Sequence, residues 1–127
     1  MADDPHHEHL VKELMEQLEP LFSQSPQAIY LYLDDEHKAC NKRFADMLGY
    51  ASPKEWAANE YPVEDLLEED REKGIRAFMD ASEHLTASTI QGTWITKNGT
   101  QIQTEVTMIP LPYKNEVFVL HFITPEN

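Results

Sequence analysis

The stretch Asn41-Lys-Arg-Phe-Ala-Asp-Met-Leu-Gly-Tyr50 decides the fold of this chain. Asn41 is a good residue to start a helix, because its side-chain oxygen can accept a backbone N–H that the first helical turn leaves unpaired. Phe44, Met47 and Leu48 follow at the spacing of one helical face. Gly49 can end the helix in a left-handed conformation at little energetic cost. The stretch therefore predicts a short helix between Asn41 and Gly49.

Strands are predicted on both sides of this helix. Residues 28–34 and 117–124 are apolar on both faces, whereas residues 101–111 alternate between apolar and polar side chains. An antiparallel strand that is apolar on both faces must have both faces covered. The first and last strands therefore belong side by side at the centre of the sheet. The segment 97–100, Lys-Asn-Gly-Thr, predicts a hairpin turn before the penultimate strand.

Three further helices are expected. Ser52-Pro-Lys-Glu55 has the form of a capping box with proline at the first helical position. The longest internal helix should run from about Glu69 to Glu83, with Gly74 as a tolerated weak point. An amphipathic helix at about residues 8–18 must bury its apolar seam, either against the sheet of the same chain or in a second copy. The seam consists of Leu10, Val11, Leu14, Met15 and Leu18.

Several short motifs follow one another at characteristic separations. They are Asn41, Phe44, Leu48, Gly49 and Tyr50, then Ser52–Trp56, Glu69–Glu72 and Lys97–Thr100. Together they resemble a PAS domain, a small sensory module of bacterial and archaeal signalling proteins, over about residues 24–124. The resemblance implies an α+β fold, in which short helices pack on one face of a five-stranded antiparallel sheet, here with an N-terminal amphipathic helix. The expected organisation is a disordered N-terminus at 1–7, a helix and linker at 8–22, the PAS-like domain at 23–124 and a tail at 125–127.

The composition limits the classes of function. With 127 residues, 41% of them apolar, the chain is suited to one globular domain. A net charge of −13 opposes binding to nucleic acid or to an anionic membrane. Residues 1–9 lack the pattern of a signal peptide, and apolar runs such as 117–123 are far shorter than the ~20 residues that cross a bilayer. Cys40 is the only cysteine and cannot form an internal disulfide, so a cytoplasmic location is expected.

A ligand pocket is expected between the sheet and the middle helices. The long helix should turn Ile75, Phe78 and Met79 inward, and His121 in the last strand is the candidate polar group. The alternative for His121 is a paired strand residue, and the same apolar side chains would equally form a filled core without a ligand. The pocket candidates are Phe44, Met47, Leu48, Trp56, Ile75, Phe78, Met79, Ile102, Val106, Met108 and His121.

No cofactor and no metal is predicted. Photosensory PAS domains use a cysteine in an Asn-Cys-Arg-Phe-like motif that this chain lacks, and Cys40 lies on a different element, as a buried structural thiol. Haem-binding PAS domains carry their axial histidine near the start of the long helix, where Arg71-Glu72 stands here. His6, His7 and His9 are potential metal ligands, but no carboxylate or cysteine at the spacing of a closed site accompanies them. A solvated chain end is the preferred interpretation.

The expected function is that of a cytoplasmic sensory or interaction domain in signal transduction, which acts by dimerisation and by binding a small apolar ligand. One alternative is a receptor whose bound metabolite or lipid controls assembly. A remote alternative is a small α+β enzyme with a pocket carboxylate or His121 as its base, although no catalytic motif is present. The expected partners are a second copy and a signalling protein that docks on the acidic stretch 55–83. The predicted dimer interface comprises Leu10, Val11, Leu14, Met15, Leu18, Tyr30 and Tyr32.

Overall fold

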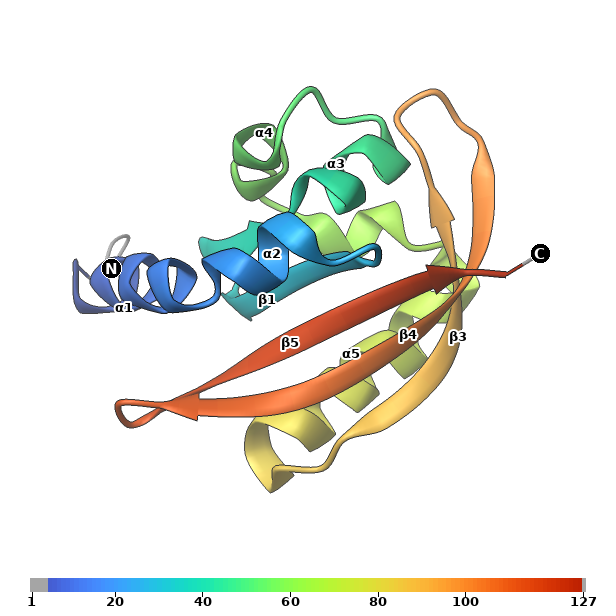
Figure 1. Ribbon diagram of the computed structural model, residues 1–127. Coiled ribbons are helices and arrows are strands. Elements are labelled where there is room, and N and C mark those ends of the chain that lie inside the picture. The colour runs from blue at the N-terminus through green and yellow to red at the C-terminus, as the bar shows by residue number, and fades with distance from the viewer. Residues whose placement is uncertain (1–4, 127) are drawn as a thin grey trace.

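The computed structural model of the chain describes residues 5–126 and has a curved antiparallel sheet with helices on both faces (Figure 1). The helices are α1 (Pro5–Gln17), α2 (Glu19–Gln24), α3 (Lys42–Leu48), α4 (Pro53–Ala57), the 3-10 turn η1 (Pro62–Asp65) and α5 (Glu68–His84). The strands are β1 (Ala28–Asp34), β2 (His37–Cys40), β3 (Ser88–Ile95), β4 (Gln101–Tyr113) and β5 (Glu116–Pro125). The predicted α+β, PAS-like fold is confirmed.

The sheet has the strand order β2-β1-β5-β4-β3. The first and last strands are adjacent, with Tyr30 opposite His121 in the register, as the apolar character of both faces predicted. The predicted turn at 97–100 joins β3 to β4 and has Gly99 at a φ of 90°. The turn between β4 and β5 uses Lys114 and Asn115 at positive φ, which suits a tight antiparallel hairpin.

The short helix predicted between Asn41 and Gly49 forms as α3. The Asn41 side chain accepts a hydrogen bond from the backbone N–H of Phe44, and Gly49 ends α3 in the left-handed region at a φ of 88°. The Ser52 side chain likewise caps α4 by accepting from the N–H of Glu55. Asn41 does more than cap, because it also bonds to Ile29 and Gln27 at the start of β1. The capping residue thus joins α3 to the central strand.

One face of the sheet is covered by the N-terminal helices of the same chain. Leu10 and Leu14 of α1 are 1% and 4% exposed, and they pack with Ile29, Leu31 and Phe118 of the central strands. The apolar seam therefore has an intramolecular partner, which is one of the two arrangements that the sequence left open. Leu10 and Leu14 are consequently not available as surface residues for a dimer. Val11, Met15 and Leu18, at the edges of the seam, are partly buried.

Tyr30 and Tyr32 lie on the opposite face of the sheet, so their predicted place in an outer dimer interface was wrong. Tyr30 packs against Trp56 of α4, and Tyr32 packs against Phe78 of α5. Strand β1 is apolar on both faces, so the alternation of its side chains defined two faces without identifying which one meets α1. Ile29 provides the contacts on the α1 side instead.

The long helix packs through small residues. The buried positions of α5 are Gly74, Ala77 and Ala81, which let the helix backbone approach the sheet closely. Ile75 and Met79, which were predicted to face inward, are 47% and 44% exposed. Phe78, the third residue predicted to face inward, does so and packs against Tyr32 of β1.

The N-terminal boundary also differs from the prediction. Helix α1 begins at Pro5 rather than near Glu8, so His6 and His7, which were assigned to a disordered end, belong to a helix. The rest of that end, residues 1–4, lies outside the described residues. Strand β5 extends to Pro125, the first residue of the predicted tail.

Candidate functional site

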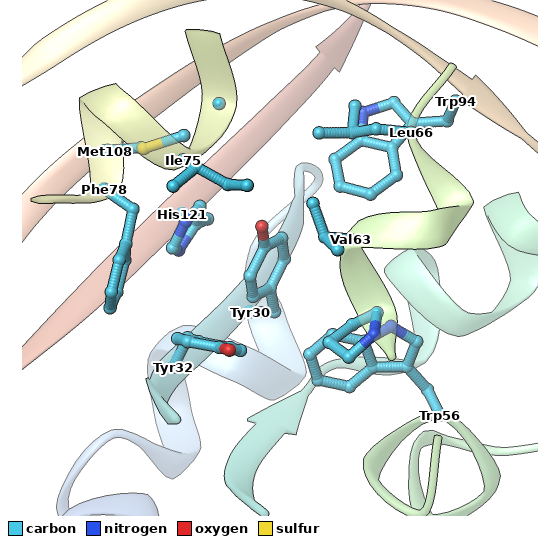
Figure 2. A pocket seen from close by; sticks show the side chains of 12 residues that line it. Tyr30, Tyr32, Trp56, Val63, Leu66, Ile75, Phe78, Trp94, Met108 and His121 are labelled. Atoms are coloured by element: carbon cyan, nitrogen blue, oxygen red, sulfur yellow. The ribbon is translucent and has the colours of Figure 1, made fainter. Parts of the chain in front are cut away.

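A pocket with a cavity volume of about 90 Å³ lies between the sheet and the helices α4, η1 and α5 (Figure 2). Aromatic rings form most of its wall, and the exposed Ile75 lies at its edge. The lining residues are Tyr30, Tyr32, Trp56, Pro62, Val63, Leu66, Gly74, Ile75, Phe78, Trp94, Met108 and His121.

The floor of the pocket is set by the pairing of the two central strands. Tyr30 of β1 and His121 of β5 are direct register partners, and their rings stack with centroids 3.9 Å apart and planes 14° from parallel. Tyr32, two residues along β1, projects from the same face, and its hydroxyl donates to the carboxylate of Asp35. The pairing of β1 with β5 thus brings three polar aromatic side chains into one apolar space.

The α4 wall is fixed by a buried lysine. Lys38 of β2 is 5% exposed, and its ammonium group donates to the backbone carbonyls of Ala57 (2.9 Å) and Asn59 (2.6 Å). These bonds hold the loop after α4 and thereby position Trp56, whose ring lies 5.5 Å from the Lys38 Nζ. Burial lowers the pKa of Lys38, and the neighbouring Asp35 opposes this effect.

The opposite wall is held by a hydrogen-bonded chain on β3 and β4. The indole Nε1–H of Trp94 donates to the hydroxyl of Thr104 at 3.0 Å, and that hydroxyl donates to the carbonyl of Gly92 at 2.8 Å. Thr104 is 1% exposed, so these bonds form away from water. They fix the orientation of the Trp94 ring, which packs edge-on against Phe44.

The titratable groups of the pocket are held in their neutral forms. His121 is 2% exposed, and burial lowers its pKa to about 3, although contacts with the carbonyls of Val119 and Tyr30 favour the charged form. Burial raises the pKa of the Tyr30 hydroxyl far above its ordinary value, and burial and Asp35 do the same for Tyr32. The pocket therefore offers neutral hydrogen-bonding groups at physiological pH, and no charge.

The Tyr30 hydroxyl is the group that faces the cavity. It points into the cavity between Ile75 and Val63 in Figure 2, and within residues 5–126 it has no hydrogen-bond partner. The indole N–H of Trp56 is also buried without a partner in this part of the chain. A buried unpaired polar group costs about 1–3 kcal/mol, and such groups call for a specific explanation.

The size of the cavity limits what it can hold. A cavity of 150 Å³ lined by apolar side chains can take up benzene, and drug-sized ligands occupy about 300–1,000 Å³. The present 90 Å³ corresponds to a ligand of few heavy atoms. Gly74 contributes to this space, because a Cβ atom there would lie 3.1 Å from the Cδ1 atom of Leu66.

The structure brings together about half of the predicted pocket residues. Trp56, Ile75, Phe78, Met108 and His121 line the cavity. The other candidates do not: Phe44, Leu48 and Val106 are buried in the surrounding core, Met47 packs at its edge, Ile102 is half-buried and Met79 is exposed.

The main residues that the sequence analysis missed are Tyr30, Tyr32, Leu66 and Trp94. The two tyrosines were assigned to the other sheet face. The pairing of β1 with β5 was predicted, and placing Tyr30 on the face of His121 would have identified them. Leu66 follows η1, and its side chain reaches the pocket only through tertiary packing.

Cys40 lies in an environment that keeps its thiol protonated. The thiol is buried, and burial raises its pKa to about 12, so it remains protonated at physiological pH. This location agrees with its interpretation as a buried structural thiol.

Between residues 5 and 126, no helix is both long enough and apolar enough to cross a membrane.

Comparison with known proteins identifies the family. The sequence model of a PAS domain family matches residues 26–124. The crystal structure of the PAS domain of an HTR-like protein from Haloarcula marismortui is similar over 97% of this chain and 100% of that chain, with a TM-score of 0.65 and 21% identity. A PAS domain from Colwellia psychrerythraea matches over 89% and 97% of the two chains, with a TM-score of 0.71 and 20% identity.

A LOV protein from Rhodobacter sphaeroides has the same fold, with a TM-score of 0.69 and 15% identity over 90% of this chain and 67% of that chain. At sequence identities this low, the similarity shows only that the structures share a fold. No curated protein is significantly similar to the chain in sequence. The family match covers most of the sequence and coincides with the sheet and helices that enclose the pocket. The chain therefore belongs to the PAS domain family, the sensory modules of signal-transduction proteins.

Proposed function

We propose that this PAS domain is a sensor that binds a small, mostly apolar ligand in the pocket, with one polar atom placed at Tyr30. The observation that carries this proposal is the Tyr30 hydroxyl, which faces an apolar cavity and has no hydrogen-bond partner among residues 5–126. A ligand atom that pairs with this hydroxyl adds a hydrogen bond inside the apolar cavity. The aromatic wall supplies the apolar contacts for the rest of the ligand.

The electrostatics of the pocket support binding rather than catalysis. A general base has a pKa near the working pH, whereas burial places the pKa of His121 at about 3. Burial also raises the pKa values of the Tyr30 and Tyr32 hydroxyls, further above physiological pH. The proposed function is therefore recognition of a ligand without chemical conversion. Flavin and haem are not proposed, because the cavity is smaller than either group requires.

A suitable probe is 1-propanol, because it combines a short apolar chain with one hydroxyl and has the few heavy atoms that the cavity can hold. We expect 1-propanol to raise the thermal midpoint of the protein and to shift amide signals of the pocket in a nitrogen–proton correlation spectrum. Tyr30→Phe should weaken 1-propanol binding about tenfold. The matched control is Tyr113→Phe, which removes a hydroxyl that donates to Glu13 (3.2 Å) on the side of the sheet covered by α1, and this variant should leave the affinity unchanged.

Native and denaturing mass spectrometry of the purified protein provide an independent test. A small molecule retained under native conditions and released on denaturation would identify the natural ligand class. If no ligand is retained, and neither 1-propanol nor the other aliphatic alcohols of one to four carbons perturb the pocket signals, the core is simply filled and the sensor proposal is wrong.

We also propose that the domain forms a homodimer beside α1, and that ligand binding controls this assembly. The support is the partly exposed edge of the seam, Val11, Met15 and Leu18, which adds apolar surface next to the covered sheet face. A stable interface buries about 1,200–2,000 Å² in total, so neighbouring residues of α2 must take part. Val11→Glu should yield monomers with unchanged helix and sheet content. A wild-type protein that sediments as a monomer at high concentration in low and high salt would refute dimerisation.

The proposed setting is a cytoplasmic signalling protein or a complex with one. The buried, unpaired Cys40 is compatible with a reducing compartment. A partner with a basic surface is supported by the acidic first turn of α5, Glu68 to Asp70. Separation of cells into cytoplasmic and membrane fractions, followed by detection of the protein, tests the location.

A further inference from the structure

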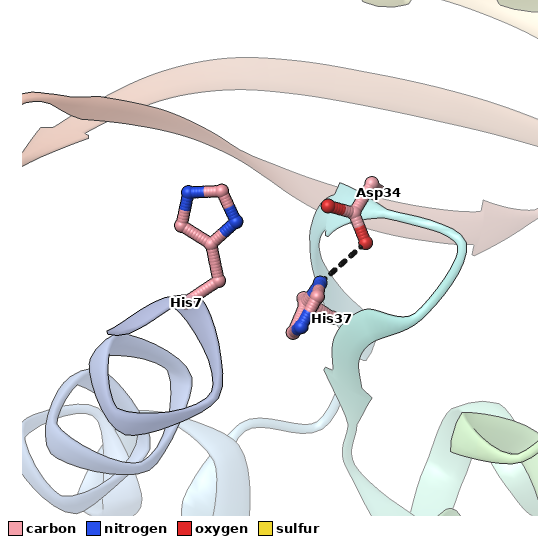
Figure 3. Close-up of side chains that lie close together, drawn as sticks. All are labelled: His7, Asp34 and His37. Atoms are coloured by element: carbon pink, nitrogen blue, oxygen red, sulfur yellow. Dashed lines mark hydrogen bonds and ion pairs between the residues drawn. The ribbon is translucent and has the colours of Figure 1, made fainter. Parts of the chain in front are cut away.

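A cluster of metal-ligating side chains lies at the start of α1, away from the pocket. His7 comes from the first turns of α1, Asp34 from the end of β1 and His37 from the start of β2 (Figure 3). One ligand atom from each of the three residues lies within 4.8 Å of the others. Helix α1 and the β1–β2 hairpin, which are distant in sequence, thus bring two imidazoles and a carboxylate close together.

The orientation of His7 is suited to metal binding. Its Nε2 atom lies 2.9 Å from Glu116 Oε2, so a carboxylate at the start of β5 accepts the Nε2–H. In Figure 3 the other ring nitrogen, Nδ1, faces Asp34 and His37. Donation of Nε2–H to a carboxylate selects the tautomer whose lone pair is on Nδ1 and fixes the direction of the ring, which is the usual arrangement behind a metal-bound histidine.

The other two groups are already in contact. His37 Nδ1 lies 2.7 Å from Asp34 Oδ1, and the His37 ring is edge-on to His7, with centroids 5.4 Å apart. Two ligands at about 2.0–2.1 Å in a tetrahedral zinc site are roughly 3.3 Å apart, so a small rotation of the Asp34 side chain admits the ion. The Asp34 side chain is 47% exposed, which leaves it free to rotate. The His37 side chain is only 8% exposed, so the surrounding residues hold it in place.

We propose that His7, Asp34 and His37 bind a borderline divalent cation, Zn²⁺ in the first place, with Glu116 as the residue that positions His7. Imidazole and carboxylate are ligands that zinc accepts, and three protein ligands leave a fourth position for water. On binding, the ion takes the place of the proton shared by His37 Nδ1 and Asp34, which moves to His37 Nε2 or to solvent. The bound ion would connect α1 to the β1–β2 turn.

The sequence alone predicted no metal site. The histidines at positions 6, 7 and 9 were judged on their own, and no carboxylate or cysteine stood at a matching spacing. The missing ligands, Asp34 and His37, come close to His7 only because α1 folds back over the central strands.

Titration calorimetry of the full chain with zinc chloride tests the proposal, together with the visible absorption of its cobalt(II) complex. We expect one ion per chain. His7→Gln and His37→Gln should each weaken zinc binding at least tenfold, and Glu116→Gln should weaken it about tenfold to 100-fold. The matched control is His9→Gln, on the same helix, whose side chain is 67% exposed and contacts Glu13. Its affinity should remain within twofold of the unmodified protein.

These outcomes distinguish a specific site formed by His7, Asp34 and His37 from nonspecific binding to surface histidines. If His9→Gln weakens binding as much as His7→Gln, or if neither His7→Gln nor His37→Gln has an effect, the proposed site is wrong. His37 is buried, so its variant must retain the native circular dichroism spectrum. If that variant fails to fold, Asp34→Asn replaces it, since this exposed side chain can be changed without opening the core. Unchanged affinity in Asp34→Asn would likewise refute the site.

Discussion

Asn41 connects α3 to β1, and its replacement by alanine measures what this connection contributes. The side chain is 4% exposed, and its Oδ1 accepts from the N–H groups of Phe44 (3.0 Å) and Ile29 (3.1 Å). Its Nδ2 donates to the carbonyl of Gln27 at 2.9 Å. Loss of a helix cap costs about 1 kcal/mol, and a buried N–H left unpaired costs about 1–3 kcal/mol more. Asn41→Ala should therefore lower the free energy of unfolding by about 2–4 kcal/mol.

Urea denaturation, followed by circular dichroism and tryptophan fluorescence, measures this change by linear extrapolation. The matched control is Ser52→Ala, which removes a cap that accepts only from Glu55 at 3.1 Å and should cost about 1 kcal/mol. If Asn41→Ala loses no more stability than Ser52→Ala, the bonds to Ile29 and Gln27 contribute nothing, and the assigned role of Asn41 as a junction is refuted.

Three further predictions concern the helix stop, the buried histidine and the pocket contents. Gly49→Val should cost about 1–2 kcal/mol or more, because a β-branched residue is strained at a φ of 88°, and an unchanged urea midpoint would contradict this. His121 stays neutral in the fold down to a pH of about 3, whereas in the unfolded chain it binds a proton below about 6.5. Stability should therefore fall as the pH falls: between pH 7 and 5 the unmodified protein should lose about 2 kcal/mol more than His121→Phe, and equal losses in both would exclude this effect. Finally, the purified protein should show no absorption beyond the ultraviolet band of its tryptophans and tyrosines, and a reproducible flavin or Soret band would overturn the proposed pocket contents.

The local features of the fold were predictable because they depend on a few neighbouring residues. A cap such as Asn41 and a helix stop such as Gly49 satisfy backbone requirements that are visible in the sequence. The central position of β1 and β5 followed from their apolar faces, because only a strand covered on both sides can be apolar on both.

The pocket was harder to predict because it depends on distances between elements. Gly74, Ala77 and Ala81 bring α5 close to the sheet, and this closeness leaves the larger Ile75 and Met79 at the surface. Hydrophobicity alone favours the larger residues for the interior, so it placed Met79 inside and missed the small residues that form the contact with the sheet, although Ile75 and Phe78 do line the pocket. The cluster of His7, Asp34 and His37 is likewise invisible along the sequence, since it exists only through the docking of α1.

The central strand β1 has a mechanical consequence for signalling. Ile29 and Leu31 project into the layer beneath α1, while Tyr30, between them, projects into the pocket. Consecutive residues are connected by rigid peptide planes, so a displacement of the Tyr30 backbone along the strand also displaces Ile29 and Leu31. Only the backbone of β1 separates the pocket from the layer beneath α1 at this point. In the proposed sensor, a ligand that shifts this backbone would act directly on the contacts of the N-terminal helix, without a hinge between them.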